Sequence, residues 1–457
     1  MGGLQGTMHW SLRSEIERHR RECGYTLSKL GELTGINHGS LSEILNGNPP
    51  RAMTIGQLDA LAAVFGREPG WLYELYTEEC ITEGRISRPR LIPYLIRCAE
   101  VGRQDCIDEV VPKLLENPKN ISTLFAVAEQ LYEEGKQKQS VPFYEYVIEN
   151  EKDSYSNQFV MSQYRLFRVV VQGTNSEENW KAVIRFDPYR RRLPENNQLD
   201  ALLQLANVCY TIHKWREMDK YADELRELAT IIYEDELRRR RSNKASEMLS
   251  TERHLVVYYG QAFLIKSIAL EKQELYEEAK RYVDGYADLS WFEFLDEIGQ
   301  IEVQKFRSWA TANLYTLNIL MGNSDVIPDY IHFLSDHPKE VLSGLVTIVS
   351  AANQYGFSID SIFEQFATHI DRFEDRQDAI GMSEHMQFRN EMAIYLFKRG
   401  KYAEGLNETL RCLSLSDTMK DYDSFKKCTA LFWMHLQYAS DEQKGKYQTI
   451  LTKGAVL

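Results

Sequence analysis

Cysteine is scarce in this 457-residue chain, and its spacing supports no obvious chemistry. The seven cysteines lie at positions 23, 80, 98, 106, 209, 412 and 428, without a Cys-x-x-Cys pair or a partner histidine at zinc spacing. Such a pattern indicates neither a disulfide framework nor a metal site, and its default compartment is the reducing cytosol. We therefore expect a cytoplasmic protein with no metal and no cofactor.

Long apolar runs are also missing. No stretch approaches the roughly 18 consecutive apolar residues of a membrane span, and the first residues lack a basic segment followed by an apolar one. We therefore expect no signal peptide, no membrane span and no membrane partner.

Catalytic motifs are absent as well. The ten histidines are scattered, and the chain contains no His-Glu-x-x-His motif, no phosphate-loop pattern and no Gly-x-Gly-x-x-Gly after a strand. We therefore expect no enzymatic activity.

Positive charge is in the minority. The 54 Lys and Arg residues face 67 Asp and Glu residues, for a net charge of −13. This balance argues against general coating of nucleic acid, which depends on neutralising phosphates. The length alone predicts more than one hydrophobic core.

A dense helical pattern occupies residues 11–80. Its centre, from Leu27 to Leu45, reads LSKLGELTGINHGSLSEIL, with apolar residues at helical spacing on both sides of a turn at 35–37. A turn this short joins two angled helices, as in a helix-turn-helix. The flanks predict one helix before this pair and two after it. The whole stretch resembles the Xre/Cro-type repressor DNA-binding domain.

In that family the second helix of the pair enters the major groove. Because Leu41, Ile44 and Leu45 should face inward, the groove side is left to five residues. These are His38, Gly39, Ser42, Glu43 and Asn46. The Asn46 side chain can form a pair of hydrogen bonds with adenine, and the Glu43 carboxylate can accept one from cytosine. This face has no Arg to form hydrogen bonds with guanine. We therefore expect recognition of the base sequence to be weak, or to depend strongly on the shape of the DNA.

Cations for the DNA phosphates are few. Residues 1–80 hold seven Lys or Arg against ten Asp or Glu, and Leu27 stands where repressors of this family commonly place a phosphate-binding Gln. We assign the phosphate contacts to Lys29, Arg51, Arg13 and Arg20. The alternative is an intact fold whose DNA binding has decayed into a protein contact.

Beyond residue 80 the pattern is helical almost throughout, and prolines mark helix boundaries. Several segments share a helix and a tight polar turn, the clearest being Met392–Tyr402. They resemble tetratricopeptide repeats, with turns expected near residues 135, 173, 213, 274, 322, 356 and 400. These intervals are longer and less regular than the family period of about 34. We expect an all-α fold, a five-helix Xre/Cro-type domain followed by an α-solenoid of degenerate repeats.

The chain thus divides into four predicted segments. They are a disordered N-terminus (1–10), the helix-turn-helix domain (11–80), the repeat superhelix (81–425) and C-terminal helices for dimerisation or capping (426–457). The stretch from Cys428 to Leu451 is strongly apolar with no later segment to cover it. An uncovered solenoid end predicts an association surface.

The inner wall of a repeat superhelix is lined by the first helix of each pair. Positions 3, 6, 10 and 13 residues before each turn share one helical face. This count places Glu129 and Tyr132 on the wall, with seven candidate peptide-binding residues, Gln163, Asn207, Tyr210, Gln261, Asn353, Gln387 and Asn390. A carboxamide both donates and accepts, which suits an extended peptide backbone. The alternative is an ordinary solvated surface.

Three further clusters favour structural interpretations. Arg238–Arg241 follows acidic residues and favours a solvated helix over a second DNA or anion contact. We interpret Arg190–Arg192 as an exposed turn, and the alternative is a contact with a peptide carboxylate. The last cluster favours repeat core over a peptide pocket and contains Tyr282, Tyr286, Trp291, Phe292 and Phe294.

The order of these domains resembles that of the cytosolic peptide-pheromone (quorum-sensing) receptors of Gram-positive bacteria, which include the phage arbitrium receptors. The resemblance implies a homodimer that binds a double-stranded DNA operator and holds a short signalling peptide inside the superhelix. It assigns the peptide-holding role to Asn207 and Asn390, and it leaves the sign of the response open. The alternative is an adaptor whose repeats sequester a partner protein and whose helix-turn-helix does not bind DNA.

Overall fold

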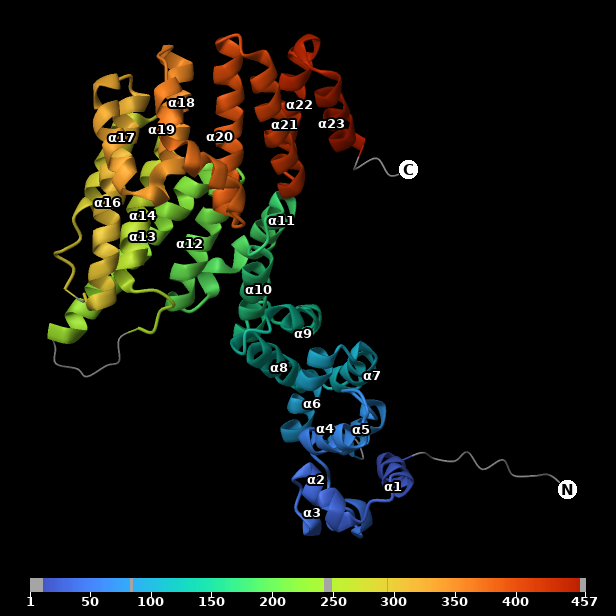
Figure 1. Ribbon diagram of the computed structural model, residues 1–457. Helices are drawn as coiled ribbons and strands as arrows, with labels where there is room; N and C mark the ends of the chain where they lie inside the picture. Colours follow the sequence, from blue (N-terminus) through green and yellow to red (C-terminus); the bar gives the residue numbers. More distant parts are fainter. Residues whose placement is uncertain (1–10, 83–84, 242–248, 294, 453–457) are drawn as a thin grey trace. The chain divides into compact units, whose positions relative to one another are not determined.

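The computed structural model describes residues 11–82, 85–241, 249–293 and 295–452, and the predicted disordered segment 1–10 lies outside them. The chain forms two compact units, one up to Leu166 and one from Phe167 onward. The described residues form 23 α-helices and one short pairing of Ile81–Thr82 (β1) with Arg85–Ile86 (β2). The predicted all-α fold, with a helix-turn-helix first and helical repeats after it, is confirmed (Figure 1).

The predicted five-helix domain opens the first unit. Its helices are α1 (Leu12–Glu22), α2 (Leu27–Thr34), α3 (His38–Asn46), α4 (Ile55–Val64) and α5 (Tyr73–Cys80). Ser11 and Thr54 form capping boxes at the starts of α1 and α4, and the side chains of Thr26 and Asn37 cap α2 and α3. Gly35 ends α2 at a φ of 71°, a conformation that costs glycine no steric clash. Local cap chemistry therefore sets these boundaries.

The rest of the first unit extends the core of this domain. The additional helices are α6 (Arg88–Val101), α7 (Gln104–Leu115), α8 (Ile121–Glu133), α9 (Gln137–Asn150) and the first part of α10 (Asn157–Val170). Tyr73 and Tyr94 are fully buried, and the Tyr94 hydroxyl donates to the Tyr73 carbonyl at 2.8 Å. One apolar core thus runs from α1 to α10. The division into two compact units at residue 166 does not coincide with the predicted domain boundaries at residues 80 and 425. Those two boundaries stay predictions.

The second unit consists of successive helix pairs. Its helices are α11 (Ser176–Phe186), α12 (Glu195–Thr211), α13 (Trp215–Arg241), α14 (Leu255–Glu271), α15 (Tyr276–Ala287), α16 (Glu297–Leu320), α17 (Ile327–Asp336), α18 (Val341–Tyr355), α19 (Asp360–Ile370), α20 (Ala379–Lys398), α21 (Tyr402–Met419), α22 (Tyr422–Met434) and α23 (Asp441–Thr452). Short 3₁₀ turns lie at Asp187–Arg192, Ser324–Val326 and Pro338–Glu340.

All seven predicted turns fall between helices. At six of them one residue adopts a positive φ, and these residues are Gly135, His213, Glu274, Gly322, Gly356 and Gly400. Such a residue reverses the backbone immediately after a helix and lets the next helix fold back. The repeat boundaries read from the sequence are therefore correct.

The first helices of five successive pairs form a closed ring in the second unit. Each of α12, α14, α16 and α18 contacts the next first helix in order, and α20 contacts α12. At this seam the Tyr210 hydroxyl donates to Glu384 Oε1 at 3.2 Å, and Ser383 Oγ donates to the Thr211 carbonyl at 3.4 Å. These two contacts join residues 174 and 172 positions apart in the sequence.

The C-terminal helices are partly covered by their own packing. Cys428 and Phe432 are buried, and Phe432 stacks on Tyr447 with ring centroids 4.2 Å apart. Trp433 and Met434, at the end of α22, remain 67% and 72% exposed. An exposed apolar patch of this kind is a candidate association surface.

Candidate functional site

The first candidate site is the exposed face of α3. Asn37 Oδ1 accepts the backbone N–H of Gly39 at 2.8 Å, which fixes the start of the helix. Leu41 and Ile44 are fully buried, and Leu45 is half-buried. The predicted base-reading residues lie on the opposite side. His38, Gly39, Glu43 and Asn46 are exposed and Ser42 is half-buried.

Glu43 and Arg51 form an ion pair beside this face. Arg51 Nη1 lies 3.0 Å from Glu43 Oε2, and both side chains are more than half exposed. An exposed pair of this kind contributes little to stability, so a phosphate can compete for the guanidinium. The predicted roles of Arg51 toward a phosphate and of Glu43 toward a base stay predictions.

Arg13 and Arg20 make structural contacts within the domain. Arg13 Nε donates to the Ile44 carbonyl at 2.8 Å, and its Nη1 lies 2.6 Å from Oε1 of Glu79, whose side chain is only 6% exposed. Arg20 lies 2.5 Å from Glu17 and holds the pKa of that carboxyl below its usual range. Arg13 thus ties the end of α3 to α5. Their predicted role toward phosphates stays a prediction.

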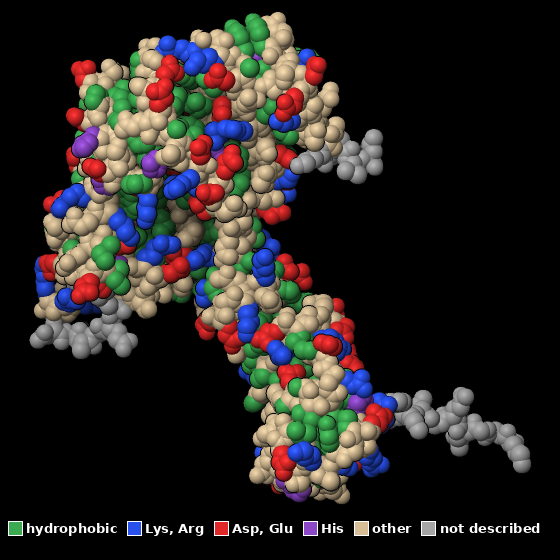
Figure 2. Space-filling model, viewed as in Figure 1, with side chains coloured by type: hydrophobic (Ala, Val, Ile, Leu, Met, Phe, Trp, Pro, Cys, Tyr) green, Lys and Arg blue, Asp and Glu red, His purple; other side chains and the backbone are tan. Residues whose placement is uncertain are grey.

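The remaining cations of the domain are also engaged. Lys29 pairs with Glu32 at 3.2 Å, Arg21 with Glu17 at 3.2 Å, and Arg67 Nη2 lies 2.8 Å from His19 Nε2. On the visible face in Figure 2, acidic and basic side chains are interspersed over α1 to α5. Arg21 and Lys29 are the more exposed of these cations, and the predicted role of Lys29 toward phosphates stays a prediction.

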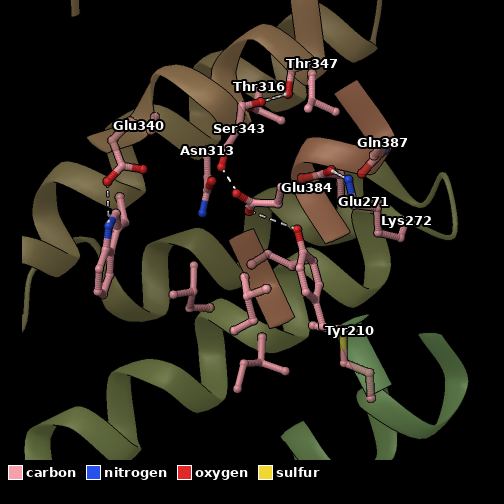
Figure 3. Close-up of a pocket in the computed structure, with 18 of the residues that line it drawn as sticks. Tyr210, Glu271, Lys272, Asn313, Thr316, Glu340, Ser343, Thr347, Glu384 and Gln387 are labelled. Carbon is pink, nitrogen blue, oxygen red and sulfur yellow. Dashed lines mark hydrogen bonds and ion pairs between the residues drawn. The ribbon is translucent and has the colours of Figure 1, made fainter. Parts of the chain in front are cut away.

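The second candidate site is a cavity of about 330 Å³ enclosed by the ring of first helices. Four predicted peptide-binding residues line it together: Asn207, Tyr210, Gln261 and Gln387. Leu264, Ile265, Ile268 and Val346 supply apolar wall. Figure 3 shows side chains from several helices converging on this space. The cavity combines an apolar lining with a few convergent polar groups, as ligand sites do.

The other three predicted residues do not line this cavity. Gln163 is buried in the first unit. Asn353 donates to the Glu391 carbonyl and carboxylate, at 2.9 Å each, and Asn390 is half-buried on α20. Their roles toward a peptide stay predictions.

The cavity also holds charged groups that the sequence analysis did not single out. Glu384 Oε1 accepts hydrogen bonds from Tyr210 at 3.2 Å and from Ser343 at 3.0 Å (Figure 3). Glu271 pairs with Lys272 at 3.0 Å. Burial raises the pKa of Glu384 and places the pKa of Tyr210 well above its usual value. The contact between α12 and α20 is thus made by the Glu384 carboxyl group, which accepts a hydrogen bond from Tyr210 inside the cavity.

The helical register contained a signal for these residues. Counting 3, 6, 10 and 13 residues back from the turn at 274 reaches Glu271, Ile268, Leu264 and Gln261, all of which line the cavity. Ser343 lies 13 residues before the turn at 356 by the same count. Glu384 lies one further helical step back on α20. The seven predicted peptide-binding residues are carboxamides and one tyrosine, so the carboxylates Glu271 and Glu384 on the same face are not among them.

The two basic runs engage nearby carboxylates. Arg238 lies 2.7 Å from Asp235, and Arg190 lies 2.7 Å from Glu224, which also lies 3.1 Å from Arg191. The pair of Arg238 agrees with the predicted solvated helix. The predicted exposed turn is wrong at Arg190, which is buried because it packs into its ion pair with Glu224, while Arg191 and Arg192 are exposed.

The predicted aromatic cluster is mainly core. Tyr286 and Phe292 are buried, and Phe292 stacks on Tyr233 with ring centroids 4.1 Å apart. Trp291 is half exposed, and Phe294 lies outside the described residues. The described members of the cluster do not line the ring cavity.

Two kinds of site are missing from the part of the chain that the structure describes. No described helix has the length and apolar character needed to cross a bilayer. The described His, Cys, Asp and Glu side chains form no group suited to holding a metal ion.

Comparison with known proteins identifies the N-terminal domain. Residues 16–72 match the family described as Helix-turn-helix (HTH_3), a match that suggests a DNA-binding transcription regulator. No curated protein matches the chain. One solved structure, described as "Circular tandem repeat protein with novel repeat topology and enhanced subunit contact surfaces", is similar over 97% of this chain and 100% of its own, at 12% identity and a TM-score of 0.21.

Proposed function

We propose that this protein is a peptide-responsive transcription regulator of the peptide-pheromone receptor group. In this proposal α3 reads operator DNA, and the ring cavity of the second unit binds a short signalling peptide. The observation that carries the proposal is the convergence of Asn207, Tyr210, Gln261 and Gln387 on one cavity in a chain whose N-terminal domain is a helix-turn-helix.

The size of the cavity limits how much peptide it encloses. A volume of about 330 Å³ lies near the lower end of the range for ligand pockets, roughly 300 to 1,000 Å³. A peptide of about five to ten residues extends by up to about 3.3 Å per residue, whereas pockets of this size hold ligands the size of a drug molecule. We infer that one end or one side-chain segment of the peptide is enclosed.

Replacing Asn207 with alanine should weaken peptide binding about tenfold or more. Leaving one buried peptide amide unpaired costs on the order of 1 to 3 kcal/mol. Asn197 lies ten residues earlier on the same helix, away from the cavity, and Asn197→Ala is the matched control. Peptides that co-purify with the full chain can be identified by mass spectrometry, resynthesised and titrated by calorimetry. Equal affinities for both variants would refute the assignment.

The proposed DNA binding can be tested on the DNA that lies upstream of the gene encoding this protein. We expect the full chain to bind a duplex from that region more tightly than a random duplex of equal length, measured by fluorescence anisotropy at several salt concentrations. Equal, weak and salt-sensitive binding to both duplexes would favour the adaptor function. The ion-paired state of the domain's cations is the observation that favours that second candidate.

We also propose that the protein is a homodimer joined through its C-terminal helices. The exposed Trp433 and Met434 make a self-complementary apolar contact possible there. The double variant Trp433→Glu, Met434→Glu should convert dimers to monomers in sedimentation velocity without loss of helical content. A dimer that persists in this variant, at the same concentration, would exclude this face.

A further inference from the structure

The ring cavity has an unusual charge balance. Its lining includes the carboxylates Glu271, Glu340 and Glu384 and a single ammonium, that of Lys272. Lys272 pairs with Glu271. Glu340 accepts a hydrogen bond from the Trp309 indole at 3.1 Å, and among the described residues no cation lies within 4.0 Å of the Glu384 carboxylate. The cavity therefore has more negative than positive charge, and its unpaired carboxylates face the space.

Hydrogen-bond acceptors surround Glu384. Glu384 Oε1 accepts hydrogen bonds from the hydroxyls of Tyr210 and Ser343, so Oε2 can accept one from another donor. Asn313 Nδ2 donates to the Tyr286 hydroxyl at 2.7 Å, so its amide oxygen is left to accept. Gln387 lies three residues after Glu384, on the same face of α20. The free Glu384 oxygen and the amide oxygens of Asn313 and Gln387 are acceptors that suit a group carrying several N–H bonds and no acceptor.

We propose that the cavity binds the positively charged group of its ligand, an ammonium or a guanidinium, against Glu384. The apolar residues Leu264, Ile265 and Ile268 then contact the carbon chain that carries this charge. The inference rests on the proposed function only in taking the ligand to be a peptide. In a peptide the charge comes from the free N-terminus or from a Lys or Arg side chain.

Burial of an unpaired carboxylate agrees with this assignment. Burial raises the pKa of Glu384, and a bound cation would lower it again, because an opposite charge favours the ionised form. The groups that face Glu384 are Tyr210 from α12, Glu271 and Lys272 from the end of α14, Ser343 from α18 and Arg376 before α20. Burial raises the pKa of Glu384, and it outweighs the hydrogen bonds from Ser343 and Tyr210 and the charges of Arg376 and Lys272, all of which lower that pKa. Cation binding should therefore release protons and weaken as the pH falls.

The charge preference can be tested without knowing the peptide. n-Pentylammonium is the probe, 1-pentanol is its uncharged counterpart, and ligand-observed NMR titration of the full chain measures both. We expect Glu384→Gln to weaken pentylammonium binding at least tenfold, to flatten its pH dependence and to leave pentanol binding unchanged within about twofold, since a hydrogen bond between two charged groups is stronger than one to a neutral group. Gln keeps the acceptor for Tyr210 and Ser343, so the ring should stay closed.

The control is Glu374→Gln, which removes the same charge from an exposed site outside the cavity. It should leave the binding of both probes unchanged. Pentylammonium that binds the unmodified chain no better than pentanol, or that binds Glu384→Gln equally well, overturns the inference.

The co-purified peptide then distinguishes the two sources of charge. One modified peptide is acetylated at its N-terminus, and a second has its Lys or Arg residues replaced by norleucine. One of the two should bind the chain at least tenfold more weakly than the unmodified peptide. If neither modified peptide loses affinity, the charge inference fails while the peptide function stands. If the chain binds no peptide but still binds pentylammonium at Glu384, the peptide function fails and the cationic subsite stands.

Discussion

Replacing Arg389 with alanine is expected to lower the free energy of unfolding of the repeat unit by about 1.5 to 3 kcal/mol. Its side chain is 4% exposed, and its Nη1 lies 2.9 Å from Oε2 of Glu408 on α21. Without Arg389, Glu408 keeps its ion pair with the half-exposed Arg411, at 3.1 Å, and loses its buried partner. A charged group that loses a buried hydrogen bond destabilises the folded state by more than an exposed ion pair stabilises it. Urea denaturation followed by circular dichroism measures the change.

A second contact of Arg389 increases the expected effect. Its Nε donates to His385 Nε2 at 2.9 Å. Burial and the neighbouring Arg389 lower the pKa of His385 to about 4, so the ring is neutral near pH 7 and can accept this bond. Arg389→Ala leaves that buried nitrogen without its donor.

The matched control is Arg372→Ala, an exposed arginine, which should change stability by no more than about 0.5 kcal/mol. Since Arg389 shares α20 with Glu384 and Gln387, its loss should also weaken ligand binding in the cavity. A loss of stability below about 1 kcal/mol would show that the Arg389–Glu408 pair does not hold α20 against α21.

The double variant Ser42→Ala, Asn46→Ala should reduce discrimination between specific and random DNA by about 1 to 3 kcal/mol for each hydrogen-bonded base that the side chains no longer reach. Both side chains lie on the outer face of α3, so the domain should remain folded. Competition between the upstream duplex and a random duplex, measured by fluorescence anisotropy, gives the discrimination directly.

Lys29→Ala is the companion variant for the phosphate contribution. Its ammonium is exposed and pairs only with Glu32 among its salt bridges, so its removal should weaken all duplexes alike and flatten the salt dependence. Arg13→Ala is a poor choice for this purpose, because Arg13 holds Ile44 and Glu79 and its removal would destabilise the domain. Unchanged discrimination in the double variant would indicate that α3 does not read bases.

The sequence by itself determined the local structure. Caps such as Asn37, positive-φ residues such as Gly400 and the apolar period specify where each helix begins and ends, because these effects act within a few residues. The family of the N-terminal domain, the seven turns and the face of each first helix follow from them. For the same reason Asn207, Tyr210, Gln261 and Gln387 could be placed on one wall before any contact between their helices was known.

Only the tertiary structure decided which distant groups meet. Arg13 contacts Glu79 instead of solvent, and Tyr210 on α12 reaches Glu384 on α20. The second contact depends on a small rotation at each helix pair, summed over the pairs between α12 and α20, and sequence periodicity does not reveal that sum. Closure of the ring is what turns an open wall of carboxamides into a cavity with a buried carboxylate. The charge of the ligand it selects is therefore a property of the fold, set by the burial of Glu384 among neighbours distant in the chain.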